Sequence, residues 1–361
     1  MKKFALMAMT ALVMVACQNN ENAYTINGTY QSAGENDSVS MSLIKGRRLV
    51  ELQKVPVVGG KFKFEGTADS VQVVALTMGD AFCQLFLEPG DIKVDLKEGE
   101  MSFALGTPNN NAYEAFSSDI KALEDEYAEI ARNAQNPELT DAQREEIKEQ
   151  MSAFEDKYFQ AINSCVIENV GNDFGLYILS NYYNMFGPAE LAPVLESYIE
   201  AFPTDTRLKQ IKSINDITLE TSEGKPFKNF EMADVDGNMH SLAEYVSANK
   251  VTLIDFWASW CGPCRAEMPA VKAAYDAYKS KGFGIVGISL DNNKEAWTGA
   301  IKNLGLDWAH LSDLKGWNNE GAKLYGVRSI PATVLVAQDG TIIARNVRGE
   351  AIKEKLAELL D

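Results

Sequence analysis

The sequence between residues 251 and 269 reads VTLIDFWASWCGPCRAEMP. Its first seven residues are almost all apolar and predict a buried strand that ends at Trp257. A short turn then leads to Cys261 and Cys264, at the start of a predicted helix. Two thiols separated by two residues can close a small disulfide ring, and a helix N-terminus stabilises a thiolate. The spacing therefore indicates a redox-active dithiol.

Cysteine pairs with this spacing also occur in zinc sites, where a second pair of ligands completes a tetrahedron. This chain has no second closely spaced cysteine pair, and its only histidines are His240 and His310. The number of ligands argues against a structural zinc site. Neither a metal nor another cofactor is predicted.

A second motif, Ile330-Pro331, precedes another apolar strand at residues 332–336. Together the two motifs resemble thioredoxin-fold oxidoreductases, in which a Trp-Cys-Gly-Pro-Cys turn and a kinked helix lie beside an Ile-Pro loop. The longer run through Pro269 is similar to the membrane-anchored, TlpA-like branch of that superfamily. The resemblance extends from about residue 225 to the C-terminus and implies an α/β thioredoxin fold there.

The resemblance also implies catalytic roles. We expect Cys261 to be the exposed attacking sulfur, because it stands at the helix start, and Cys264 to be the resolving thiol. Asp255, on the preceding apolar strand, is the expected general base and acid, with a pKa raised by desolvation. We expect the peptide bond before Pro331 to be cis, so that this loop presses against the disulfide.

Four further residues are predicted to contact the substrate. The backbone of Ile330 is expected to pair with an extended substrate segment, and Trp260 to flank the site and limit solvent access. Gly262 and Pro263, between the cysteines, match the residues of thioredoxin. This choice favours a reducing dithiol.

The N-terminus reads as an export signal followed by a lipid-attachment site. Residues 1–17 combine two lysines with an uncharged apolar run that is too short to span a bilayer. They end in Met-Val-Ala-Cys, which resembles a lipoprotein box with Cys17 as the acylated residue. Gln18, where an inner-membrane retention signal carries aspartate, favours the outer membrane. The alternative is an ordinary signal peptide cleaved nearby.

The charge of the chain excludes some partners. Its 51 acidic and 34 basic residues give a net charge of −17, which argues against nucleic acid and against electrostatic adhesion to anionic lipid. A protein held on a membrane by its lipid, and facing the periplasm of the cell envelope, is consistent with this charge.

The remaining sequence divides into three parts. Short alternating strands predict a small antiparallel sandwich or barrel at residues 24–106, and amphipathic periodicity predicts helices at 107–216. The thioredoxin-like domain is expected at 219–361. The β-rich part resembles a domain of unknown function in Bacteroidetes-type lipoproteins. Cys83 and Cys165 are expected in apolar cores, and a disulfide between them is the alternative.

These observations predict an envelope thiol–disulfide oxidoreductase that reduces or isomerises disulfide-bonded envelope proteins and is recharged by a membrane electron donor. Two alternatives remain. A thiol peroxidase of the wider superfamily is disfavoured, because Phe256 and Trp257 occupy the stretch where such enzymes carry a Pro-x-x-x-Thr-x-x-Cys arrangement. The other is a partner-binding lipoprotein in which the redox domain is accessory.

Overall fold

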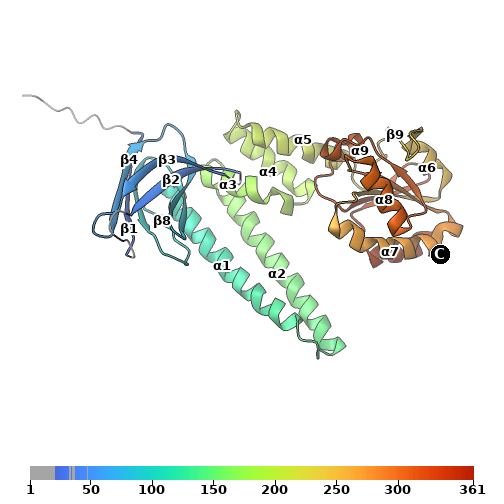
Figure 1. Ribbon diagram of the computed structural model, residues 1–361, viewed down its shortest axis with the longest axis horizontal. Helices are drawn as coiled ribbons and strands as arrows, with labels where there is room; N and C mark the ends of the chain where they lie inside the picture. Colours follow the sequence, from blue (N-terminus) through green and yellow to red (C-terminus); the bar gives the residue numbers. More distant parts are fainter. Residues whose placement is uncertain (1–20, 32–33, 35–36, 47) are drawn as a thin grey trace, which may run out of the picture. The chain divides into compact units, whose positions relative to one another are not determined.

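The structure is a computed structural model that describes residues 21–31, 34, 37–46 and 48–361. The chain forms two compact units, and the boundary between them in the sequence falls between Tyr182 and Tyr183 (Figure 1). The predicted export signal and Cys17 lie outside the described residues. None of the described helices is long and apolar enough to cross a membrane.

The N-terminal unit begins with two four-stranded sheets that share one apolar core. Their orders are β4-β1-β7-β8 and β3-β2-β5-β6. Alternation of apolar and polar residues explains this packing, because Ile26 and Phe64 of one sheet face Val74 and Leu85 of the other in the shared core. The strands are β1 (Ala23–Thr29), β2 (Ser38–Lys45), β3 (Arg48–Pro56), β4 (Lys61–Thr67), β5 (Gln72–Met78), β6 (Ala81–Leu87), β7 (Gly90–Asp95) and β8 (Ala104–Leu105).

The sandwich differs from the predicted one in two respects. Strand β1 pairs in parallel with β7, so the prediction of a purely antiparallel domain is wrong. Such a pairing joins segments more than sixty residues apart, which local turn signals cannot reveal. Strand β3 was not predicted, because its residues are mostly exposed and lack a clean alternation of apolar and polar side chains.

Three helices complete this unit: α1 (Pro108–Ala134), α2 (Asp141–Glu168) and α3 (Asp173–Tyr182). At the start of helix α2, Thr140 and Gln143 form a capping box. Cys83 is buried as expected, but Cys165 is only partly buried. Both are free thiols, so the alternative of a disulfide between them is wrong.

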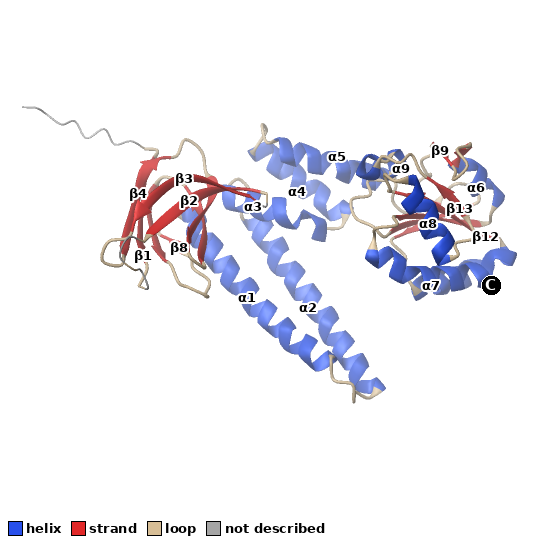
Figure 2. Ribbon diagram, viewed as in Figure 1, coloured by secondary structure: helices blue, strands red, loops and turns tan. Residues whose placement is uncertain are grey.

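The C-terminal unit contains a five-stranded sheet of order β13-β12-β11-β14-β15, with helices around it (Figure 2). The strands of that sheet are β11 (Val251–Trp257), β12 (Phe283–Ser289), β13 (Ala309–Leu311), β14 (Ala332–Ala337) and β15 (Ile342–Arg345). Two further strands, β9 (Glu231–Ala233) and β10 (Met239–Ser241), pair with each other. The helices are α4 (Pro188–Ala201), α5 (Thr206–Glu220), α6 (Leu242–Ala248), α7 (Gly262–Tyr278), α8 (Lys294–Leu304), α9 (Glu320–Leu324) and α10 (Glu350–Leu360).

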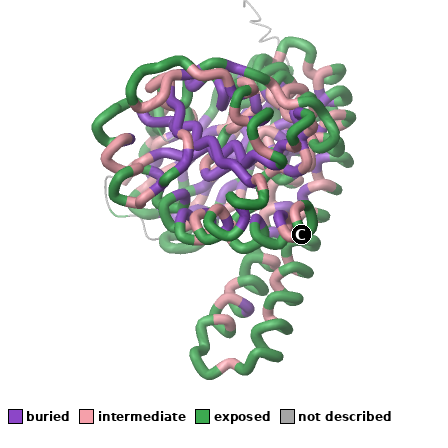
Figure 3. The backbone as a smooth tube through the Cα atoms, turned by 90° about the vertical axis from the view of Figure 1, so that its right-hand side faces the viewer, coloured by how far each residue is buried: buried purple, intermediate pink, exposed green. Residues whose placement is uncertain are grey.

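Strand β11 is the central strand of this sheet. It pairs in parallel with β12 and antiparallel with β14, and all seven of its residues are buried. A strand covered on both faces reads as a continuous apolar run, which is why the sequence predicts its limits correctly. Buried backbone fills the centre of this unit and exposed segments surround it (Figure 3). The sheet thus fixes the end of β11, which lies just before the cysteines.

Candidate active site

The two cysteines lie where β11 gives way to helix α7. Cys261 is the N-cap of α7 and Cys264 lies in its first turn, and a disulfide joins them. The backbone N–H of Cys264 lies 3.2 Å from the sulfur of Cys261 and points at it. An amide donor at a helix start stabilises negative charge on that sulfur once the disulfide is reduced.

The two sulfur-bearing residues differ little in exposure. Cys261 is 5% exposed and Cys264 is 1% exposed. The prediction of an exposed attacking sulfur is therefore wrong for the oxidised protein, because the loop before Pro331 covers Cys261. The two residues between the cysteines, Gly262 and Pro263, are exposed.

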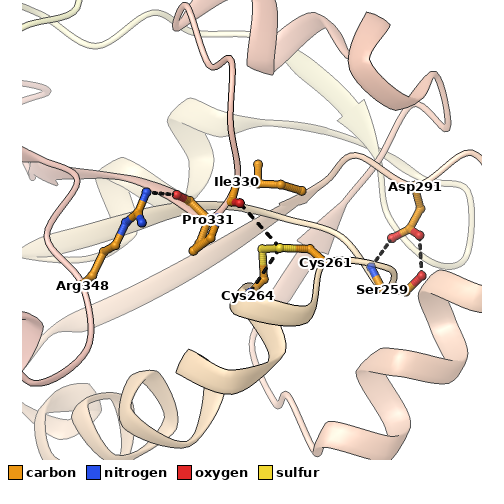
Figure 4. Close-up of a disulfide and its surroundings, with 7 residues drawn as sticks. All are labelled: Ser259, Cys261, Cys264, Asp291, Ile330, Pro331 and Arg348. Carbon is orange, nitrogen blue, oxygen red and sulfur yellow. Dashed lines mark hydrogen bonds between the residues drawn. A yellow bond between two sulfur atoms is a disulfide. The ribbon is translucent and has the colours of Figure 1, made fainter. Parts of the chain in front are cut away.

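The loop that covers Cys261 contains the predicted cis-proline. The Ile330–Pro331 peptide bond is cis, as the resemblance implies. The carbonyl oxygen of Ile330 lies 3.6 Å from the sulfur of Cys261. On the other side of the loop, the guanidinium of Arg348 donates a hydrogen bond to the carbonyl oxygen of Pro331 (Figure 4). Arg348 thus ties this loop to the segment between β15 and α10.

Asp255 lies on β11 between Gly287 of β12 and Thr333 of β14. It is 3% exposed, and its Oδ2 atom is buried without a hydrogen-bond partner in the described structure. The pKa of Asp255 is raised to about 7, mainly by burial and to a smaller extent by the charge of Glu267, while the charge of Arg348 opposes the shift. The predicted direction is confirmed, and Asp255 can exchange a proton near neutrality.

Trp260 extends into solvent beside the disulfide. It is 53% exposed, and its ring lies 6.1 Å from that of Trp317, which is 49% exposed. Trp260 precedes Cys261 directly, so it flanks the site as expected. Trp317 was missed, because it lies 57 positions later and no local pattern connects the two rings.

A buried carboxylate that sequence reasoning missed fixes the turn before the cysteines. Asp291 is 1% exposed and accepts hydrogen bonds from the backbone N–H and the hydroxyl of Ser259 (Figure 4). It also accepts a hydrogen bond from the Ser289 hydroxyl, 2.7 Å away. A usable signal was its position just after the apolar strand β12, since side chains that follow neighbouring parallel strands meet at one edge of the sheet.

We expect Asp291→Asn to destabilise this domain by about 2 kcal/mol, because its new amide group cannot accept all three hydrogen bonds. All five tryptophans lie between residues 257 and 317, so fluorescence during urea unfolding reports on this domain in the intact chain. The matched control is Asp307→Asn, whose side chain is 81% exposed. Equal unfolding midpoints for Asp291→Asn and wild type would contradict this role.

The sheet order, the disulfide at a helix start and the adjacent cis-proline define a thioredoxin-fold thiol–disulfide oxidoreductase. Residues 222–360 match the Redoxin family model, and residues 24–113 match a domain of unknown function, DUF4369. The thiol-disulfide oxidoreductase ResA of Bacillus thuringiensis subsp. konkukian is 34% identical over 137 residues, which cover 38% of this chain and 76% of that protein. The chain belongs to this family of thiol-disulfide oxidoreductases.

Another relative and two solved structures are also similar to this chain. ResA of Halalkalibacterium halodurans is 30% identical over 139 residues, or 38% of this chain and 76% of that protein. A solved thiol-disulfide oxidoreductase from Bacteroides fragilis is 37% identical and aligns with 38% of this chain and all of its own, with a TM-score of 0.36. The thioredoxin domain of a thiol-disulfide oxidoreductase from Bacteroides vulgatus is 29% identical, with 39% and 99% coverage and a TM-score of 0.36. The predicted TlpA-like domain with an additional N-terminal domain is confirmed.

Proposed function

We propose that this thiol–disulfide oxidoreductase reduces disulfides of other proteins through Cys261 and Cys264. The observation that carries the proposal is the disulfide between these residues at the start of α7, with the Ile330 carbonyl against it. That geometry leaves one sulfur beside a loop that can receive an extended segment. It also leaves the second sulfur close enough to complete the exchange.

The exchange has two steps. The thiolate of Cys261 attacks one sulfur of the substrate disulfide, so that a mixed disulfide forms and the other substrate sulfur leaves as a thiolate. Cys264 then gives its proton to Asp255 and attacks the sulfur of Cys261. This closes the Cys261–Cys264 disulfide and releases the second substrate thiol. Two electrons have passed to the substrate, and a membrane-bound dithiol donor restores the reduced protein.

We also propose a cellular location for the protein and a direction for the thiol–disulfide exchange. The apolar run before Cys17 supports export and lipid attachment, which would hold the protein on the outer membrane facing the periplasm. Gly262 and Pro263 support the reducing direction, and a reduction potential close to the value of about −120 mV found for the strong oxidant DsbA would reverse it. The division at 24–106, 107–216 and 219–361 also remains a proposal.

Insulin reduction tests the activity directly. We expect the wild-type protein to accelerate precipitation of insulin chains by dithiothreitol at pH 7, because it supplies a faster thiolate than the reductant. The double variant Cys261→Ser, Cys264→Ser should match the reaction without protein. Wild-type protein that does not accelerate precipitation, while it retains its tryptophan fluorescence, would reject the proposed reductase.

A further inference from the structure

The C-terminal unit contains a cavity of about 370 Å³ beside the cis-proline loop. One wall comes from residues 183–218, which precede the part of the chain that matches the Redoxin model. The cavity therefore lies between this preceding helical segment and the redox domain. We call it the Arg328 cavity, and the lining residues that matter below are Tyr183, Asn184, Arg328, Ser329, Ala332 and Arg345.

Residues on both sides of Ile330 line the cavity. Ser329 and Ala332 line it, and the carbonyl of Ile330 between them lies 3.6 Å from the sulfur of Cys261. An extended segment advances about 3.3 Å per residue. A substrate segment bound to the Ile330 backbone therefore needs only two to four residues beyond its cysteine to reach the cavity.

The charge of the cavity is opposite to that of the chain. The net charge of the protein is −17, yet the lining contains two arginines, Arg328 and Arg345, and no aspartate or glutamate. Among the described residues, neither arginine forms an ion pair with a carboxylate. Low-dielectric walls around charges of one sign concentrate their field, so the cavity attracts an anionic group.

The two arginines have different tasks. Arg345 is partly buried and donates hydrogen bonds to the carbonyl oxygens of Thr221 and Tyr325, which fixes the end of α5 against the domain. Arg328 is exposed. Its guanidinium lies 4.5 Å from the centre of the Tyr183 ring, and its Nη1 donates to Asn184.

The contacts of Arg328 orient it and leave donors free. Its Nε and Nη2 atoms have no acceptor among the residues that the structure describes. A planar guanidinium held by stacking presents these two N–H groups in the geometry that a carboxylate accepts in bidentate fashion. The Arg328 guanidinium is therefore oriented before any ligand binds.

We propose that the Arg328 cavity binds an acidic side chain of the substrate protein, located two to four residues from the cysteine that Cys261 attacks. The inference rests on the proposed function, and it adds a substrate preference to it. The carboxylate forms paired hydrogen bonds with Arg328, and Arg345 contributes positive charge behind it. The preference belongs to the two arginines of the redox domain, of which Arg328 is oriented by the helical segment before that domain, and not to the dithiol.

Matched peptide disulfides test this preference. Each peptide has one cysteine in disulfide linkage to a fluorogenic thiol, blocked ends, and either Glu or Gln at one position two to four residues before or after the cysteine. The measured quantity is the ratio of kcat/KM for the Glu peptide to kcat/KM for the Gln peptide. We expect a ratio of about ten in at least one position, as for one charged hydrogen-bonded contact near solvent.

Variants of Arg328 test whether the preference for the Glu peptide arises in the cavity. Arg328→Gln should lower it to about one, and Arg328→Lys should give an intermediate value, because lysine keeps the charge but not the fork. Lys353→Gln is the matched control: it removes one exposed positive charge from α10, outside the cavity lining, and should keep the wild-type ratio.

The outcomes separate this inference from the proposed function. If the wild-type protein reduces insulin but gives a Glu-to-Gln ratio of kcat/KM of one for every peptide pair, the inference is overturned and the proposed function is not. A preference that survives in Arg328→Gln would overturn it as well. Wild-type protein that reduces neither insulin nor any peptide would overturn the proposed reductase, and the inference with it.

Discussion

Asp255→Asn should stabilise the redox domain at pH 8 by up to about 4 kcal/mol and leave its stability at pH 4 unchanged. Asp255 is fully enclosed on the central strand, and its pKa is about 7 where an ordinary aspartate has 3.8. Each pKa unit corresponds to about 1.4 kcal/mol. A neutral asparagine of the same shape avoids the cost of a buried charge.

The pH dependence follows from proton binding. Between pH 4 and pH 7 the folded protein keeps the Asp255 proton, whereas the unfolded chain has lost it. The stability of the wild type therefore falls as the pH rises through this window, and it is constant above it. Below pH 4 both states are protonated, so wild type and variant should agree.

Urea unfolding of the oxidised protein, followed by tryptophan fluorescence at pH 4, 6 and 8, measures this difference. Asp307→Asn is the control, because its exposed side chain should give the wild-type curve at each pH. A difference between Asp255→Asn and wild type that does not change from pH 4 to pH 8 would contradict the assigned pKa. The same variant should slow release of the substrate by tenfold or more, because Cys264 loses its proton acceptor.

Cys264→Ser should prolong the mixed disulfide roughly a thousandfold. In the wild type, the sulfur of Cys264 is held in the same first turn of α7 as the N-cap Cys261. Intramolecular attack from such a position corresponds to effective concentrations far above those of any free thiol. Without Cys264, only an external thiol can resolve the mixed disulfide, so the complex should accumulate as a covalent adduct.

The two single variants should behave differently. Cys264→Ser should form adducts with substrate proteins that are visible on non-reducing gels and can be identified by mass spectrometry. Cys261→Ser should form almost none, because Cys264 lies inside the first turn of α7 and lacks the N-cap position that places the Cys261 sulfur beside a helix amide and the Ile330 carbonyl. Equal capture by both variants would show that the sulfurs exchange roles and would contradict the proposed order of attack.

The sequence by itself determined the fold of the redox domain and the position of its cysteine pair, because both are encoded in short stretches of chain. The apolar run at 251–257 is strand β11 with the predicted limits, and Cys261 begins the helix that follows it. Burial on both faces leaves a continuous apolar signal. The raised pKa of Asp255 could be anticipated for the same reason, since its neighbours in the strand are apolar.

Only the tertiary structure revealed the residues that act on the site from distant parts of the chain. Asp291 holds Ser259 across 32 positions, Arg348 holds Pro331 from the segment before α10, and Arg328 stacks on a tyrosine 145 residues earlier. The parallel pairing of β1 with β7 is of the same kind. Each of these polar contacts is specific in space but leaves no period or spacing in the sequence. Chain topology decides which of the many charged side chains meet.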